Sequence, residues 1–347
     1  MKNFNKHNMD DIRNKRYVIW NNKGGVGKTA LTFVIATEYA ISNPEKEVIV
    51  IDVCPQANVS EVILGGNGMG SKKAQDLMNH GNTIGGYFRK RIENTPYNKT
   101  GNESSYAVKA KLYNDQMPEN LSIVVGDPIL ERLVDSMTGL ARQDMPQDAW
   151  AKIHSWIGDL IDGIMNDKGG RAVFLLDCNP SFAIYTKQAL LATKRLIVPC
   201  TADGSSLRGI DNIASLVYGI NNEYDVFSKK AKEFNLTLPL IHLVPLNQST
   251  QYNKDAAMAF KSLYGEVRKK VENLKNSQKH IFSEEGLSDT FFDVMDMHSA
   301  FKIAIHEGSP LSKLKAGPHT IHGESCQVNA ANLEKYQGCV NDLIKRF

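Results

Sequence analysis

The sequence contains little cysteine, no long apolar run and almost no excess of charge. Its five cysteines lie far apart and form no C-x-x-C pair, which argues against a structural zinc site and a disulfide framework. No apolar segment approaches the ~20 residues that cross a bilayer. The formal net charge is +3, from 41 basic and 38 acidic residues, so any surface for nucleic acid has to be local.

The first residues also lack the features of a targeting segment. Residues 1–16 are polar and charged and contain no apolar core of a signal peptide. Together with the scattered cysteines, this predicts a cytoplasmic protein. What the sequence does contain is apolar material for a sizeable core, at 42% of 347 residues.

One glycine-rich segment carries most of the functional information. It reads Asn22-Lys23-Gly24-Gly25-Val26-Gly27-Lys28-Thr29, between a strand-like stretch and a helix-like one. Strand, glycine loop and helix are the setting of a phosphate-binding loop, whose backbone N–H groups and helix N-terminus face an anion. We expect Lys28 to reach the β- and γ-phosphates and the Thr29 hydroxyl to bind Mg²⁺. The expected nucleotide-binding residues are Gly24, Gly25, Val26, Gly27, Lys28, Thr29 and Ala30.

The segment departs from the ordinary pattern G-x-x-x-x-G-K-[ST] at its first position and carries an additional lysine at the next. Asn22 stands where that pattern has glycine, and Lys23 is an additional lysine before the glycines. The loop therefore resembles the deviant Walker A loop of the ParA/MinD family of ATPases. In that family the additional lysine reaches the partner's nucleotide across a dimer interface. The resemblance thus implies a homodimer that sandwiches ATP, with Lys23 acting in trans.

The chain is most similar to ParA-type partition ATPases that lack an N-terminal helix-turn-helix. Only about a dozen residues precede the first expected strand, too few for such a motif. Sequence-specific operator binding is therefore not expected.

The alternation of strand-like and helix-like segments predicts an α/β fold of the P-loop NTPase type, with a mostly parallel, twisted sheet and helices on both faces. The expected strands are Tyr17–Trp20, Val48–Val53, Leu121–Val125, Ala172–Asp177, Arg195–Cys200 and Leu240–Pro245. The expected helices are Thr29–Ile41, Gln147–Met165, Tyr185–Ala192, Gly209–Gly219, Asp255–Leu274 and Leu333–Phe347.

Residues 1–347 are expected to form a single ATPase domain with a family-variable surface insertion at about 66–120. Residues 65–70 are glycine-rich and predict a flexible break. Residues 94–120 are polar and rich in Asn, Lys and Tyr, and some helix is expected around Thr83–Ile92. A solvated loop without a specific role and a recognition element both remain open for this insertion.

A second family element lies at Asp52-Val53-Cys54-Pro55-Gln56, where relatives read like D-x-D-P-Q. The second aspartate of that pattern helps to position the attacking water, and this chain has Cys54 in its place. A thiol is mostly neutral at pH 7 and is a poor acceptor. Asp52 is therefore the expected catalytic residue beside Lys23 and Lys28. A nucleotide-dependent switch with little hydrolysis remains the alternative.

Two further elements complete the expected site. Asp177 ends the apolar strand that starts at Ala172, as in a Walker B motif, and is expected to hold Mg²⁺ together with Thr29. Asn247 follows another strand end that passes near the adenine in relatives. The segment Thr201–Ile210 resembles a helix start that borders the dimer interface in the family, and Met297–Leu311 resembles its C-terminal "A-x-x-x-G-x-P" stretch.

Together these features predict a ParA-like, slow Mg²⁺-dependent ATPase with ATP and Mg²⁺ as cofactors. The resemblance implies non-specific DNA binding, partition of plasmid or chromosomal DNA or positioning of a protein cargo, and a small centromere-binding or cargo-adaptor partner. The protein would then be associated with the nucleoid. Candidate DNA contacts are Arg268, Lys269, Lys270 and Lys275, whose alternative is a solvated helix face.

A MinD-like, membrane-associated positioning ATPase is the other alternative. The segment Leu333–Phe347 is amphipathic and ends in basic and aromatic residues, so it could lie on a membrane. Glu334 and Asp342 weaken that case, and such a last helix more often packs against the sheet. Membrane binding is therefore the less favoured of the two partners.

Overall fold

The computed structural model describes residues 15–249, 254–321 and 323–347. Its strands are β1 (Arg16–Ile19), β2 (Glu47–Val53), β3 (Val108–Lys109), β4 (Leu121–Val124), β5 (Ala172–Cys178), β6 (Arg195–Ile197), β7 (Leu240–Ser249), β8 (Phe291–Met295), β9 (Gly317–Ile321) and β10 (Glu324–Val328). Its α-helices are α2 (Lys28–Ser42), α3 (Asn58–Gly65), α4 (Met69–Asn79), α5 (Ile84–Asn94), α6 (Ile129–Ala141), α7 (Ala149–His154), α8 (Trp156–Asp167), α9 (Ile184–Ala192), α10 (Gly204–Tyr218), α11 (Phe227–Glu233), α12 (Lys254–Ser277), α13 (Glu284–Ser288), α14 (His298–Glu307) and α15 (Ala330–Ile344).

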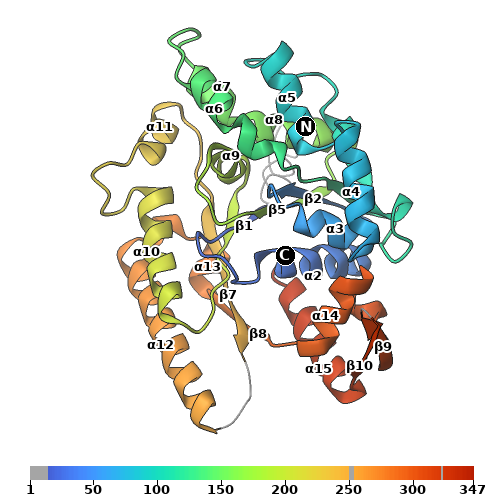
Figure 1. Ribbon diagram of the computed structural model, residues 1–347. Helices are drawn as coiled ribbons and strands as arrows, with labels where there is room; N and C mark the ends of the chain where they lie inside the picture. The colour runs from blue at the N-terminus through green and yellow to red at the C-terminus, as the bar shows by residue number, and fades with distance from the viewer. Residues whose placement is uncertain (1–14, 250–253, 322) are drawn as a thin grey trace, which may run out of the picture.

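Strands β1 to β8 form one sheet in the order β3-β4-β2-β5-β1-β6-β7-β8. All neighbouring pairs are parallel except β3 with β4. Parallel neighbours require crossover connections, and helices supply them here. The predicted α/β class, with a mostly parallel sheet and helices on both faces, is therefore confirmed (Figure 1).

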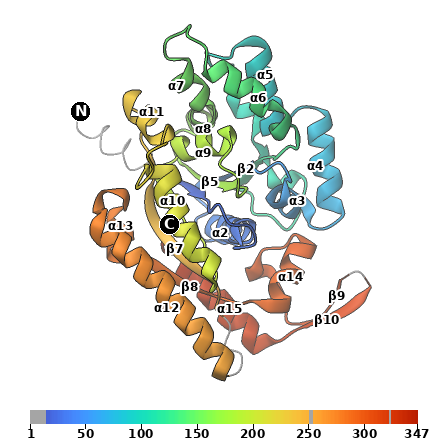
Figure 2. The same ribbon diagram turned by 60° about the vertical axis from the view of Figure 1, so that its left-hand side comes forward.

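Alternation along the central strands gives the sheet two separate cores. Val18 on β1 and Ile49 on β2 face helices α5 to α12, whereas Tyr17 and Val48 face α2, α3, α14 and α15. Because both faces are covered, these strands are apolar at nearly every position. Figures 1 and 2 show the two helical layers on opposite sides of the sheet.

Several elements differ from those expected. The helix expected at Gln147–Met165 is two helices, α7 and α8, which meet at Ser155. Strand β8 at the sheet edge and the antiparallel hairpin β9–β10 were not predicted. The hairpin projects from the C-terminal part of the molecule (Figure 2). All three strands are partly exposed and lack the continuous apolar runs of the central strands.

Residues 66–120 contain α4, α5, β3 and two short 3₁₀ helices, η1 (Glu103–Tyr106) and η2 (Ala110–Leu112). Tyr87 and Phe88 of α5 are fully buried in the core, and β3 adds an antiparallel strand to the sheet edge. The buried Arg91 pairs with Asp159 of α8 at 2.9 Å. Much of this segment is thus part of the folded core.

The C-terminal helix α15 also packs on the body of the protein. Its apolar face, which includes Leu333, Val340 and Leu343, is buried in the same core as α2. The face that would lie on a membrane is therefore already covered. Among the described helices, none combines the length and the apolar character needed to cross a bilayer.

Candidate functional site

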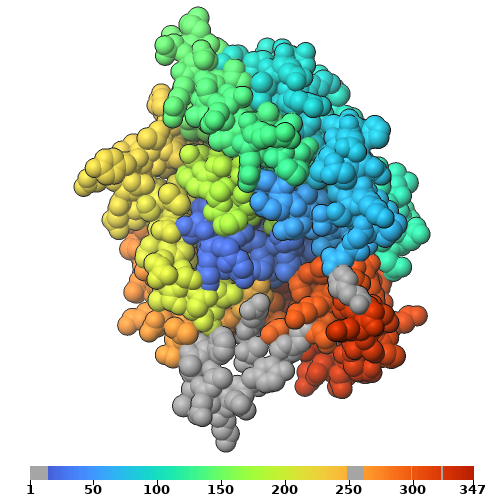
Figure 3. Space-filling model, viewed as in Figure 1, coloured from blue at the N-terminus to red at the C-terminus, as the bar shows by residue number. Residues whose placement is uncertain are grey.

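The glycine loop lies between β1 and α2 at the edge of the sheet where the parallel strands end. Asp52 at the end of β2 and Ile19 at the end of β1 are both register partners of Asp177 on β5. The carboxyl ends of parallel strands thus bring together segments that are far apart in the sequence. On the face shown in Figure 3, the blue surface of the first part of the chain lies at the centre, flanked by the α9–α10 and α3–α4 regions.

Two glycines of the loop have backbone conformations that favour glycine. Gly25 and Gly27 have φ values of +74° and +83°. A Cβ atom on Gly27 would lie only 1.9 Å from Nδ2 of Asn247, which donates a 3.0 Å hydrogen bond to the Val26 carbonyl. The structure thus places Asn247 against the loop itself, where it fixes the loop to the end of β7.

Lys28 is held inside the loop by two backbone carbonyls. Its ammonium donates to the carbonyl oxygens of Asn21 at 3.1 Å and Lys23 at 2.7 Å. Burial lowers the pKa of Lys28, while the nearby Asp177 carboxylate acts in the opposite direction. A poorly solvated cation at the floor of the loop is a strong electrostatic partner for phosphate oxygens.

The predicted metal ligands Thr29 and Asp177 lie together. The Thr29 hydroxyl donates to Oδ2 of Asp177 at 2.8 Å, and the Thr32 hydroxyl approaches Oδ1 at 3.2 Å. Burial raises the pKa of Asp177, and the two threonine hydrogen bonds counteract part of that effect. A hydroxyl and a carboxylate at this position are the hard oxygen donors that Mg²⁺ prefers.

Lys23 is bound within its own chain. Its ammonium forms an ion pair with Asp203 and a 2.7 Å hydrogen bond with Thr201 Oγ1. Asp203 also caps α10 by accepting hydrogen bonds from the backbone N–H groups of Ser205 and Ser206. Burial alone would raise the pKa of Asp203. The hydrogen bonds to its carboxylate, of which the one from Lys23 has the largest effect, lower that pKa below its ordinary value. In this conformation Lys23, the additional lysine of the loop, is directed toward the start of α10.

Asp52 is fully buried and has both carboxylate oxygens engaged. Oδ1 accepts from the Cys54 N–H at 3.0 Å, and Oδ2 accepts from the Ser60 N–H at 3.1 Å and the Ser60 hydroxyl at 2.7 Å. Burial and the charge of Asp177 both raise the pKa of Asp52. The carboxylate thus ties the end of β2 to α3, and its expected role near the attacking water remains a prediction.

Cys54 lies close to the same edge with its thiol directed to a neighbour. The Sγ atom donates to Oε1 of Gln56 at 2.9 Å, and the side chain is buried. Burial raises the pKa of this thiol to about 12, so it is neutral at pH 7. The position that carries a carboxylate in D-x-D-P-Q therefore supplies neither a base nor a metal ligand here.

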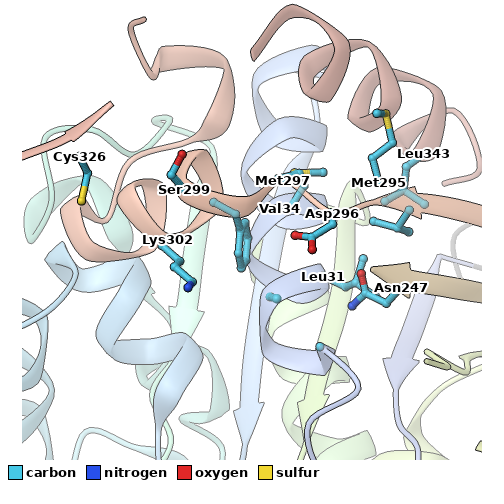
Figure 4. Close-up of a pocket in the computed structure, with 14 residues that line it drawn as sticks. Leu31, Val34, Asn247, Met295, Asp296, Met297, Ser299, Lys302, Cys326 and Leu343 are labelled. Atoms are coloured by element: carbon cyan, nitrogen blue, oxygen red, sulfur yellow. The ribbon is translucent and has the colours of Figure 1, made fainter. Parts of the chain in front are cut away.

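A cavity of about 550 Å³ opens next to the loop. Gly27, Ala30 and Asn247 form its loop side, and residues from β8, α14, β10 and α15 form the opposite side. In Figure 4, Asn247 and Leu31 lie at one end, Asp296 lies between them and α14, and Ser299 and Lys302 lie farther along. The cavity thus combines apolar walls with a few polar groups, as small-molecule sites do.

Three of the four candidate DNA contacts are already paired with acids. Arg268 pairs with Asp293, Lys270 with Asp211 and Lys275 with Glu272. Lys269 is exposed and takes part in none of the ion pairs found among the described residues. The four candidate positions therefore present less uncompensated positive charge than their sequence indicates.

Sequence reasoning missed the partner of Lys23. Asp203 stands directly before Gly204-Ser205-Ser206 at the start of α10, and an aspartate before a helix is a common N-cap. That signal locates the cap but does not show that Lys23 reaches it, because the two residues are 180 positions apart.

The family model described as an AAA domain matches residues 14–229. Among curated proteins, the virulence plasmid ParA family protein pGP5-D of Chlamydia psittaci is 26% identical over 204 residues, or 59% of this chain. That alignment spans 63% of the Chlamydia psittaci protein, which is less than two thirds of its length.

Solved structures show the same fold at low sequence identity. The ATP complex of a single-residue variant of McdA from Cyanothece superposes with a TM-score of 0.54 and 14% identity, over 95% of this chain and 96% of that one. The ParA of pNOB8 superposes with a TM-score of 0.50 and 15% identity, over 80% of each chain. At these identities the likeness concerns the fold.

Proposed function

The chain belongs to the AAA domain family whose model covers residues 14–229, as a ParA/MinD-type ATPase, and on this premise we propose that it is an ATP-dependent dimerising switch that binds DNA without sequence preference. In this role it partitions DNA or positions a protein cargo. The observation that carries the proposal is the loop that holds both Lys23 and Lys28 and places Thr29 on Asp177.

ATP fits the geometry around this loop. The phosphates would lie over Gly24 and Gly25, where an added Cβ meets no atom within 4 Å. The adjoining cavity at Gly27, Ala30 and Asn247 has room for the ribose and the base. McdA, which shares the fold, was solved with ATP. These features support ATP as the ligand and keep Asn247 as a candidate for the base side of the site.

Mg²⁺ fits the pair Thr29 and Asp177. When bound, the ion would neutralise phosphate charge, and these two residues would hold it directly or through water. On ATP binding, the Lys28 ammonium would move from the carbonyls of Asn21 and Lys23 to the β- and γ-phosphates. Lys23 would leave Asp203 and contact the nucleotide of the other subunit. Since hydrolysis resets the dimer, a slow turnover suits a switch.

DNA binding is the part of the proposal that most needs a test. We expect purified protein to bind random-sequence duplex DNA with ATP, and more weakly with ADP or without nucleotide, by fluorescence anisotropy. Because phosphate contacts release counterions, raising the salt from about 50 to 200 mM should weaken binding about 10³-fold if some six phosphates are contacted. The absence of DNA binding under every nucleotide condition would contradict this part.

Charge reversal locates the DNA surface in the same assay. Lys269→Glu is expected to weaken binding and reduce the salt dependence, because Lys269 is the exposed cation of the α12 group. Lys229 and Lys232 of α11 are also exposed and form the alternative surface. Lys72→Glu on α4 is the matched control, an exposed lysine outside both groups.

A nucleotide-dependent switch with little hydrolysis is the second candidate, and Cys54 favours it. Cys54→Asp is expected to raise the ATP turnover at least 10-fold, since a positioned general base contributes about 10²–10⁴. Cys54→Asn keeps a similar size without the carboxylate and should leave the turnover unchanged. Phosphate release at saturating ATP measures both variants. An unchanged rate in Cys54→Asp would mean that Asp52 or another group already positions the attacking water.

A further inference from the structure

A second cavity, of about 750 Å³, lies away from the glycine loop between α6, α7, α9 and α11. Both ribbon views place these helices together on the face of the sheet opposite α2 (Figures 1 and 2). Its walls are aromatic and basic, unlike those of the cavity beside the loop. The lining includes Arg142, Trp150, Phe182, Lys187, Val226 and Phe234.

Aromatic rings form one wall of this cavity. Trp150 is stacked on His154 with ring centroids 3.9 Å apart, and on Phe234 of α11 at 5.8 Å with an interplanar angle of 15°. Burial lowers the pKa of His154 to about 4, so the ring is neutral at pH 7. The stacked rings give the cavity a flat wall suited to apolar and aromatic side chains.

The charges of the lining are mostly positive. Arg142, Lys187 and Lys230 stand against the single carboxylate of Asp144. Lys230 is paired with Glu233, but no carboxylate among the described residues pairs with the Lys187 ammonium. Burial lowers the pKa of Lys187, and its ammonium lies 4.9 Å from the centroid of the Phe182 ring. A partly desolvated cation without an acid is complementary to an incoming carboxylate.

The rim of the cavity exposes large apolar side chains. Tyr224, Met145 and Val226 are 90%, 77% and 63% exposed. Val226 lines the cavity, and Tyr224 and Met145 lie close in the chain to the lining residues Val226 and Asp144. These three exposed residues make up half of the exposed large hydrophobic residues among those described; the others are Met69, Leu112 and Leu287. A partner segment that enters the cavity could cover these exposed apolar side chains.

We propose that this cavity is the docking site for an extended segment of a partner protein that carries an acidic side chain between apolar or aromatic ones. The carboxylate would pair with Lys187, and the apolar side chains would cover Trp150 and the rim. The proposal rests on the proposed function only in one respect, which is that we assign this segment to the small adaptor protein that such an ATPase would work with. The binding event itself requires no nucleotide.

The position of the cavity would allow a bound partner to influence the nucleotide loop. Phe182 of its wall lies five residues after Asp177 in the chain, and its ring contacts Trp20 with centroids 5.6 Å apart. Trp20 directly precedes Asn21, whose carbonyl accepts the hydrogen bond from Lys28. An occupant of the cavity would therefore contact a residue that packs against the base of the nucleotide loop.

Selection from a displayed library of random 12-residue peptides tests the proposal on the full-length protein without nucleotide. We expect enrichment of peptides with Asp or Glu beside Phe, Trp or Leu. A synthetic peptide of the enriched sequence is then titrated while tryptophan fluorescence is recorded. Trp20 and Trp156 are fully buried, so Trp150 is the tryptophan that reports contact at the cavity. The absence of such enrichment, or of a fluorescence change, would overturn the proposal.

Paired changes in peptide and protein make the test specific. Replacing the peptide's acid by its amide should weaken binding to the wild type about 10-fold, the loss of one charge-assisted contact. Lys187→Met should bind both peptides equally, whereas the control Lys72→Glu should discriminate as the wild type does. If Lys187→Met distinguishes the acid peptide from the amide peptide as strongly as the wild type does, Lys187 does not bind the peptide's carboxylate. That result would refute the role of Lys187 wherever the peptide binds.

The ATPase assay separates this proposal from the proposed function. If the peptide binds and shifts the turnover, both stand. If the peptide binds with the predicted specificity but the protein neither binds nor hydrolyses ATP, the docking site stands and the proposed function fails. If ATP-dependent activity is present and no acidic apolar peptide binds, the docking site fails alone.

Discussion

Lys28→Ala is expected to lower the rate of ATP hydrolysis about 10²–10³-fold, the usual loss when one preorganised charge partner is removed from a reacting site. The Lys28 ammonium lies at the floor of the loop, bound to the carbonyls of Asn21 and Lys23 and shielded from water. Because it is poorly solvated, its interaction with phosphate oxygens is stronger than that of a surface lysine. Phosphate release at saturating ATP measures the effect.

A folding control accompanies this variant, because removal of Lys28 leaves the carbonyls of Asn21 and Lys23 without this donor. The thermal midpoint should be recorded for Lys28→Ala and for Lys46→Ala, whose lysine lies after α2 and outside the loop. Full activity in a folded Lys28→Ala protein would contradict the assignment of the site. Loss of activity with an unchanged thermal midpoint would support it.

Lys23→Ala is expected to leave the protein monomeric in the presence of ATP and to lower the turnover about 10³-fold, the lower end of what a cation supplied in trans contributes. In the structure this lysine is bound within its own chain. Its partners Asp203 and Thr201 lie at the start of α10, in a part of the chain that borders the dimer interface in relatives. Analytical ultracentrifugation with ATP and with ADP measures the mass.

Asp203→Asn is the informative companion variant. Asparagine is as good a helix cap as aspartate, so α10 should remain intact while the ion pair with Lys23 is lost. Lys23 is then released from its own chain, and the dimer should form at lower protein concentration than in the wild type. If Lys23→Ala dimerises with ATP as the wild type does, the sandwich-dimer prediction is refuted.

The central strands could be predicted because a strand that is buried on both faces is apolar at nearly every position. Strands β1, β2, β4 and β5 are continuous apolar runs, and each predicted range agrees with the structure to within one residue at either end. Strand β8 could not be predicted in this way, since it lies at the sheet edge and Val294 is its only buried residue. The break between α7 and α8 was also missed, because apolar periodicity continues across Ser155.

Residues 66–120 show how composition can mislead. Their many Asn and Lys residues left both a solvated loop and a recognition element open, whereas Asn114 and Asn120 use their side chains as internal donors to backbone carbonyls. Nδ2 of Asn120 alone lies 2.8–3.0 Å from the carbonyl oxygens of Ala40, Asn43 and Lys46, among which its two N–H groups are shared. Polar residues that satisfy buried backbone groups are indistinguishable by composition from residues that face water.

The candidate site was predictable where the chemistry depends on short spacing. The loop, Thr29 and Asp177 follow from motifs, and the structure brings Thr29 and Asp177 into contact. The side-chain orientations were not predictable, since they depend on tertiary neighbours. For example, the Asn247 amide donates to the Val26 carbonyl, and the Asp52 carboxylate accepts from the Ser60 hydroxyl. Lys23 likewise forms its ion pair with Asp203.

The ion pair between Lys23 and Asp203 sets a concentration threshold for the proposed assembly. In a two-fold symmetric dimer, each chain must release this pair before its own lysine can cross the interface, so two pairs are lost when both lysines cross. Both side chains of this pair are partly exposed, and ion pairs at a protein surface are worth about 0–1 kcal/mol each. Two of them raise the dissociation constant up to about 30-fold. ATP-loaded monomers would therefore accumulate until their local density is high, which confines dimers to places where the protein is already concentrated.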